Sequence, residues 1–131
     1  MIKVKVFKQA NYPVSSVEIK KRLGDFFQSQ GVIADLEIGV SIVGVKEMLQ
    51  LSQKYLGEKG VVHNVLSFPS AETKGEFILP PGINDLGEIV ICFPKTREEA
   101  GREGVLVKEK LLALVLHGAR HLMGKHHRIG Y

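Results

Sequence analysis

Four of the five histidines in this chain lie in one short segment, residues 116–127. His117 and His121 are one helical turn apart, so on a helix their imidazoles project from the same face. Gly124 can end that helix with a positive φ, and the chain can then turn back and bring His127 toward the other two rings. The segment therefore predicts a metal site held by three imidazoles, with a fourth position open for water.

The spacing of these histidines also argues against one kind of chemistry, peptide hydrolysis. It differs at one position from the long zinc-peptidase signature His-Glu-x-x-His-x-x-Gly-x-x-His, because the glutamate that acts there as general base is Gly118 here. The pattern keeps the ligands for zinc but lacks the usual proton acceptor for peptide hydrolysis, which argues against a peptidase. Zinc is the expected ion, and nickel or copper also suits three imidazoles.

Ordinary structural roles are alternatives for the charged residues around the histidines. Basic side chains favour helix C-termini, and Arg120 fits that role as well as it fits a contact to substrate. His126 has three readings: a residue behind the ligands, a ligand that competes with His127, or a surface residue.

Composition and charge bound the class of protein. The chain has 131 residues, 44% of them hydrophobic, and we expect a single domain over residues 1–131. No apolar run is long enough to cross a bilayer, no N-terminal signal pattern is present, and the single cysteine, Cys92, is expected to be a buried packing residue. These features predict a soluble cytoplasmic protein. A net charge of +4 is compatible with RNA as a partner.

Hydrophobic patterning predicts the elements that position the site. Strands are expected at residues 2–7, 35–43, 61–69 and 86–92, the last being central because it is apolar on both faces. Helices are expected at residues 16–30, 45–56 and 105–123, with Val17 and Leu106 among their inward residues, and a charged helical turn at 94–102. Gly104 is expected to open the last helix. The predicted fold is α+β, a mixed sheet of about four strands packed against helices, with the metal site on the C-terminal part of a buried helix.

Three separate blocks of the chain resemble the YbeY-type endoribonucleases, a family of single-domain metal-dependent hydrolases of bacteria. The blocks are His117-Gly118 with His121-Leu122, Gly124 and His127; Asn64-Val65-Leu66-Ser67-Phe68-Pro69; and Leu86-Gly87-Glu88-Ile89-Val90-Ile91. Together with a similar second strand and helix, they span about residues 36 to 127. The chain differs from the family pattern at Leu56, where relatives have arginine, at His63, where they have threonine, and at His126, where they have aspartate.

The resemblance implies one divalent metal, zinc or a similar ion, held by three histidines, and cleavage of single-stranded RNA. It also implies a role in ribosomal RNA maturation, especially at the 3′ end of the small-subunit RNA, and in ribosome quality control. The expected partners are therefore ribosomal RNA and the small ribosomal subunit, with no membrane partner. Two alternatives are a non-catalytic, metal-containing ribosome- or RNA-binding factor and, less in keeping with Gly118, a metal-dependent peptide or ester hydrolase.

Further candidate residues lie outside the three ligands. Asn64 and Ser67 are candidates for orienting ligands or substrate, and a turn role is equally open for each. Glu88 is a candidate partner of the ligands or proton acceptor, and a strand-end carboxylate with a structural hydrogen bond is equally open. For His63, a strand edge is favoured over an approach to the cleft.

Overall fold

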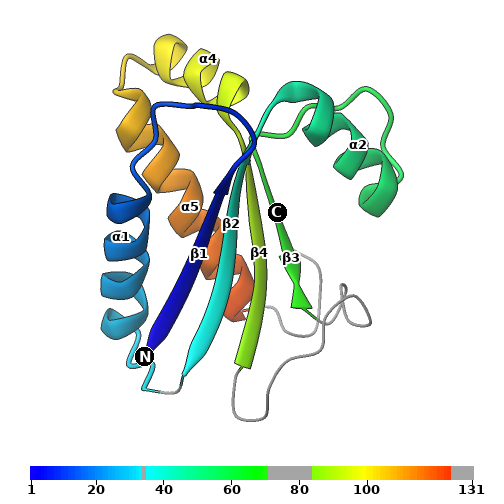
Figure 1. Cartoon of the computed structure of the whole chain (residues 1–131). Helices are drawn as coiled ribbons and strands as arrows, with labels where there is room; N and C mark the ends of the chain where they lie inside the picture. The colour runs from blue at the N-terminus through cyan, green and yellow to red at the C-terminus, as the bar shows by residue number, and fades with distance from the viewer. Residues whose placement is uncertain (34, 71–83, 125–131) are drawn as a thin grey trace.

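The computed structural model of the chain describes residues 1–33, 35–70 and 84–124 and contains a four-stranded mixed sheet with helices against both faces (Figure 1). Its elements are, in chain order, β1 (Ile2–Lys8), α1 (Ser16–Ser29), β2 (Leu36–Val43), α2 (Val45–Leu56), β3 (Val65–Pro69), β4 (Asn84–Cys92), α4 (Phe93–Glu103) and α5 (Val107–Gly124). The predicted α+β class with a mixed sheet of four strands is confirmed.

The strand order in the sheet is β1-β2-β4-β3. β1 pairs with β2 and β2 with β4 in parallel, whereas β3 runs antiparallel to β4. β4 is central, as its two apolar faces predict: Ile89 and Ile91 are buried in the core on one side, and Val90 and Cys92 on the other. Burial also raises the pKa of the Cys92 thiol, so this residue is the packing cysteine that the sequence predicts.

Two layers of helices cover the sheet. α1 and α5 pack over one face, where their buried side chains join those of all four strands in the main core. α2 packs on the other face through Met48 and through Tyr55, whose ring is 4.8 Å from that of Phe68 of β3 at an angle of 50°. Figure 1 shows α1 and α5 side by side and α2 apart from them. In the described part of the chain, no helix is both long and apolar enough to span a membrane.

α1 begins at the predicted place, because the Ser15 hydroxyl accepts a hydrogen bond from the Glu18 backbone N–H at 3.1 Å. Its buried residues Ile19, Leu23 and Phe27 repeat every four positions. The inward placement predicted for Val17 is wrong, since its side chain is 75% exposed. Two residues correspond to about 200° around a helix, so Val17 lies on the side opposite Ile19.

The region between β4 and α5 is more helical than predicted. Instead of a single charged turn, α4 is a full helix of 11 residues, which Pro94 in its first turn favours. Gly104 ends this helix with φ = 70° and does not open the next one. α5 therefore starts at Val107, and Leu106, in the connection, is 70% exposed where an inward position was predicted.

Two further boundaries differ near the predicted site. β3 starts at Val65, so residues 61–64 form a loop and not the first half of a strand. Gly124 is the last residue of α5 and does not have the positive φ expected of a helix-ending glycine. The last turn of α5 is thus regular through Gly124, and His126 and His127 lie outside the described residues.

Candidate active site

His117 and His121 form a converging pair on the last turns of α5. Their Nε2 atoms are 3.0 Å apart, and their ring centroids are 4.4 Å apart at an interplanar angle of 68°. Two imidazole nitrogens bound to one tetrahedral zinc ion are about 3.3 Å apart, given Zn–N distances of about 2.05 Å. The pair therefore needs only a few tenths of an ångström of adjustment to bind one ion. His117 is exposed and His121 half-buried, so the site opens to solvent.

The third predicted ligand stays a prediction. His127, like His126, falls outside the residues that the structure describes. Within residues 1–33, 35–70 and 84–124, no cluster of three or more histidine, cysteine or carboxylate side chains is placed to hold a metal ion. The described residues therefore supply two of the three expected ligands.

His117 of this pair borders an open depression of about 410 Å³, which we call the histidine cleft. Its lining residues come from the loop before β3, from the start of β3 and from one side of α5: His63, Asn64, Val65, Ala113, Leu114, His117 and Arg120. The preference for a strand-edge position of His63 is wrong, because β3 begins only at Val65 and His63 lies in the cleft wall.

The turn after α2 brings a second titratable residue to His63. Gly57 and Gly60 both have positive φ, 68° and 72°, which lets the chain reverse within a few residues. The Glu58 Oε1 atom lies 2.7 Å from His63 Nε2 as a result. Sequence reasoning did not identify Glu58. The only local signal for it is the pair of turn-forming glycines on either side.

Asn64 is tied to α4 as well as to the cleft. Its side-chain Nδ2 donates to Glu99 Oε1 at 2.8 Å, and its backbone oxygen accepts from the Cys92 N–H at 2.9 Å. Lys110 of α5 lies 3.8 Å from the same Glu99 oxygen. Asn64 thus fixes the loop before β3, and Asn64 itself also lines the cleft.

Replacing Asn64 by aspartate should destabilise the fold by about 1 kcal/mol at neutral pH, because it puts a second carboxylate against Glu99, a repulsion that Lys110 and Arg102 offset only in part. The loss should shrink as pH falls toward about 4 and be absent below it, because the introduced carboxyl then binds a proton and can donate to Glu99. Thermal unfolding of the wild type and the variant, at neutral pH and below about pH 4, measures the difference in stability. An equal loss at both would contradict the proposed contact.

Ser67 lies inside β3 and is 3% exposed, so the turn role is wrong for it. It pairs with Ile89 of β4, whose side chain lies against Gly118 of α5. Ser67 is therefore beneath the segment of α5 that carries the histidines, and its ligand-orienting role stays a prediction.

Gly118 explains why the peptidase glutamate is absent. A Cβ built at this position would be 2.8 Å from Cγ2 of Ile89, a fully buried residue of β4. Since real Cβ atoms essentially never come that close to another heavy atom, any side chain at this position would force Ile89 or α5 to shift. Position 118, directly after His117, faces the core, so a residue there cannot present a general base to the cleft.

The structure separates Glu88 from the histidines. Alternate residues of β4 face opposite sides of the sheet, and Ile89 is the one that faces α5. Glu88 points to the other side, where its carboxylate lies over Gly39 of β2 and borders a depression with Tyr55. The structure therefore does not bring Glu88 together with His117 and His121.

Burial raises the pKa of Glu88, and the nearby Asp85 raises it further. Ionisation of Glu88 therefore costs more free energy in the folded chain than in the unfolded chain. This loss of folding stability is absent below about pH 4 and grows as pH rises through the folded pKa. We expect Glu88→Gln to stabilise the protein at about pH 8 by about 0.5 kcal/mol after allowing for solvent screening, or roughly 2 °C in Tm. The gain should vanish at about pH 3.5. A Tm difference that does not change with pH would contradict this account.

Arg120 lines the cleft with its side chain exposed, and its guanidinium carbon is 5.6 Å from the centre of the Phe26 ring on α1. The ring can hold the stem of the arginine while the charge stays accessible. Arg120 is thus a cation beside the histidine pair, and a contact to substrate stays a prediction.

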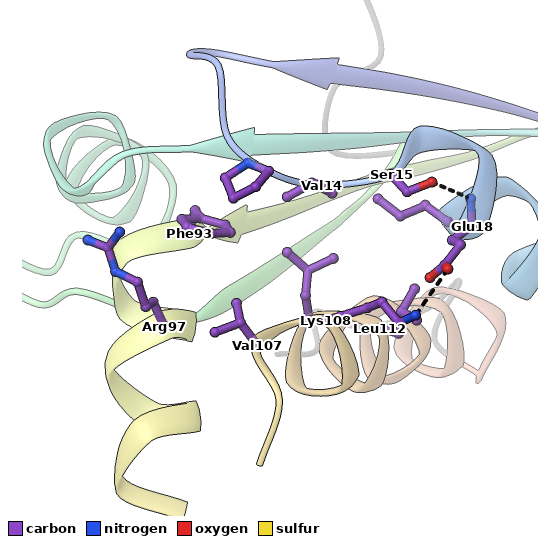
Figure 2. A pocket seen from close by; sticks show the side chains of 11 residues that line it. Val14, Ser15, Glu18, Phe93, Arg97, Val107, Lys108 and Leu112 are labelled. Atoms are coloured by element: carbon purple, nitrogen blue, oxygen red, sulfur yellow. Dashed lines mark hydrogen bonds and ion pairs between the residues drawn. The ribbon is translucent and has the colours of Figure 1, made fainter. Parts of the chain in front are cut away.

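A second, more apolar cavity of about 260 Å³ lies at the opposite end of α5 (Figure 2). Val14, Phe93 and Leu112 contribute apolar walls, and Lys108 is 3.2 Å from Glu18 at the rim. No imidazole lines it. The groups suited to hydrolysis are therefore concentrated in the histidine cleft.

Comparisons with known proteins show which family the chain is similar to. The family model described as "Endoribonuclease YbeY" matches residues 6–129. A protein named Endoribonuclease YbeY from Xanthomonas euvesicatoria pv. vesicatoria is 38% identical over 100 residues, which is 75% of this chain and 60% of that protein. One of the same name from Acinetobacter baumannii is 31% identical over 121 residues, which is 92% of this chain and 75% of that protein.

A solved structure shares the fold. The solution structure of TM1509 from Thermotoga maritima matches with a TM-score of 0.64 at 23% identity, covering 95% of this chain and 75% of that one. The chain thus spans between about three fifths and three quarters of the length of the proteins it matches. With a family model that covers nearly all of its residues, and with relatives above 30% identity, the chain belongs to the endoribonuclease YbeY family.

Proposed function

We propose that this protein is a metal-dependent endoribonuclease that cleaves single-stranded RNA, with one zinc ion per chain as the expected cofactor. The observation that carries the proposal is the convergence of the His117 and His121 Nε2 atoms, 3.0 Å apart, beside an open cleft. His127 is the proposed third ligand. The family name supports RNA as the substrate.

His117, His121, Arg120 and Asn64 each have a part in this proposal. Zinc bound to three imidazoles supplies a Lewis acid and activates water at neutral pH. His117 and His121 hold the ion on a rigid helix, which fixes where the reacting phosphodiester must bind. Arg120 donates hydrogen bonds to phosphate oxygens from the same side of α5, in a salt-dependent way. Asn64 holds the loop that forms the other wall.

Ribosomal RNA is the proposed target, acted on in the cytoplasm during maturation of the small-subunit RNA 3′ end and in ribosome quality control. The net charge of +4 favours a polyanionic substrate of this kind. An open cleft suits a flexible single strand, whose backbone can bend toward a site on a helix surface, better than a rigid duplex.

The test uses one end-labelled RNA, either free or annealed to its complement. We expect cleavage of the free strand only, its loss after chelation and its return when zinc is added back. Tight RNA binding without cleavage, unchanged by chelation, would instead show a non-catalytic RNA-binding factor and overturn the enzymatic proposal.

A further inference from the structure

We propose that Arg120 binds a phosphate of the RNA next to the one that is cleaved, and that Phe26 of α1 is the positioning residue that holds the arginine for this contact. The inference rests on the proposed RNA cleavage. It adds to that function the direction of the strand, which leaves the histidine cleft over the side of α5 that faces α1.

The first support is the position of Arg120 on α5. Arg120 follows His117 by three residues, so the two are neighbours on one face of the helix, and both line the histidine cleft. The guanidinium of Arg120 extends toward α1, where its central carbon is 5.6 Å from the centre of the Phe26 ring. Figure 1 shows α1 beside α5. The positive charge therefore lies on the α1 side of the histidine pair, where it suits a phosphate that flanks the reacting one.

The second support is how the Phe26 ring is itself held. Phe26 is half-buried and packs against the main core. Its ring meets that of Phe27 edge to face, with the centroids 5.3 Å apart at an angle of 65°, and Phe27 is fully buried. The core thus fixes the ring, and the ring limits the positions of the guanidinium. Such a restriction lowers the entropy that an arginine side chain loses when it binds a ligand.

The third support is that Arg120 keeps its capacity to bind an anion. Among the residues that the structure describes, Arg120 forms no salt bridge, whereas two lysines of the groove between α1 and α5 are paired. Lys21 lies 3.1 Å from Asp25. Lys108 lies 3.2 Å from Glu18. A guanidinium over a ring keeps the N–H donors in its plane for other partners, and two of these donors match two oxygens of one phosphate.

The test of the phosphate contact uses short single strands of RNA in which one phosphate beside the cleaved linkage is replaced by an uncharged methylphosphonate. We expect the replacement on one side of that linkage to lower kcat/KM of the wild type by about tenfold, because a charge-assisted contact is lost. The same replacement should lower kcat/KM of Arg120→Gln by less than about twofold, because this variant has no such contact to lose. Equal losses in the two proteins at every position would overturn the contact.

The test of the positioning role compares two replacements of Phe26. We expect Phe26→Leu to raise KM for RNA by about threefold with kcat unchanged, whereas Phe26→Tyr, which keeps the ring, should behave as the wild type. In the Arg120→Gln background, Phe26→Leu should raise KM no further. An equal effect of Phe26→Leu with and without Arg120 would show a purely structural role and overturn the positioning. Phe26→Met replaces the leucine variant if that variant fails to fold.

Arg97→Gln is the matched control, because Arg97 repeats the geometry away from the histidines. Its guanidinium carbon is 5.7 Å from the centre of the Phe93 ring, and it lines the second cavity. In a plot of log affinity for single-stranded RNA against log salt concentration, Arg120→Gln should lower the slope by about 0.7, the value for one phosphate contact. Arg97→Gln should leave the slope unchanged.

The possible failures can be told apart. Equal changes of slope for Arg120→Gln and Arg97→Gln would show a loss of net charge alone and would overturn the inference. The proposed endoribonuclease would then still stand, because the wild type cleaves unmodified RNA. A wild-type protein that does not cleave unmodified RNA would overturn both.

Discussion

Replacing His117 by alanine is expected to lower single-stranded RNA cleavage by about 1,000-fold or more while leaving the fold intact. The residue is exposed and has no part in the main core, so its removal should change the free energy of unfolding by less than about 0.5 kcal/mol. Its Nε2 faces that of His121 at 3.0 Å, so the same change removes half of the described ligand pair. Initial cleavage rates and metal content per chain, measured on one preparation, check the prediction.

The design of this experiment uses the fact that ligands act as a unit. The double variant with His121→Ala should be little worse than either single variant, because each change alone already disrupts the metal site. Lys108→Ala is the control on the same helix: it is an exposed side chain near the other end of α5, and its removal should leave both metal content and cleavage unchanged. Normal cleavage by His117→Ala would rule out the histidine pair as the catalytic centre.

Replacing Gly118 by glutamate, which creates the peptidase signature at the level of sequence, is expected to unfold the protein and not to produce a peptidase. Even Gly118→Ala should destabilise it by about 1–3 kcal/mol, because the new methyl group would be 2.8 Å from Ile89 Cγ2 in the core. Glutamate adds the cost of burying a carboxylate that has no partner there. Thermal unfolding of the two variants, with circular dichroism at low temperature, measures the effect.

Gly101→Ala is the matched control for this prediction. Gly101 lies within α4 and would have nothing within 4 Å of an added Cβ, so alanine there should stabilise the helix by about 0.5–1 kcal/mol. A gain in stability for Gly101→Ala together with a loss for Gly118→Ala would show that packing, and not helix propensity, decides the effect at Gly118. A stabilised Gly118→Ala variant would show that α5 does not pack on β4 as described.

Periodicity was enough to predict most of the fold. The alternation of apolar residues predicts β1 and β2, and the run from Ile89 to Cys92, which is apolar on both faces, predicts β4 as a central strand. The errors fall at connections. Gly104 reads equally well as the start or the end of a helix, and only the structure shows that it ends α4. Val17 and Leu106 are apolar residues at helix starts, where hydrophobicity does not indicate which side faces the sheet.

The candidate site could be predicted only where its residues are close in sequence. His117 and His121 share one helix, so their spacing alone predicts that they converge. Glu88 and Asn64 both lie in blocks that resemble the family. The alternation of side chains along β4 nevertheless places Glu88 on the face of the sheet opposite α5. Which residues of β4 face α5 depends on the register of that strand, which the sequence blocks do not reveal. Glu58 and His63 meet through a turn with two left-handed glycines, and such contacts depend on the path of the loop.

Titration of the metal-free protein with zinc, followed through its rate of single-stranded RNA cleavage, tests the central claim most directly. The account predicts no cleavage without metal, a rise in rate with each addition and a plateau at about one ion per chain. His117→Ala should stay inactive throughout the same titration. Cleavage by the metal-free protein at the full rate, or an equal response from His117→Ala, would contradict the claim that this histidine pair forms the metal centre of an endoribonuclease.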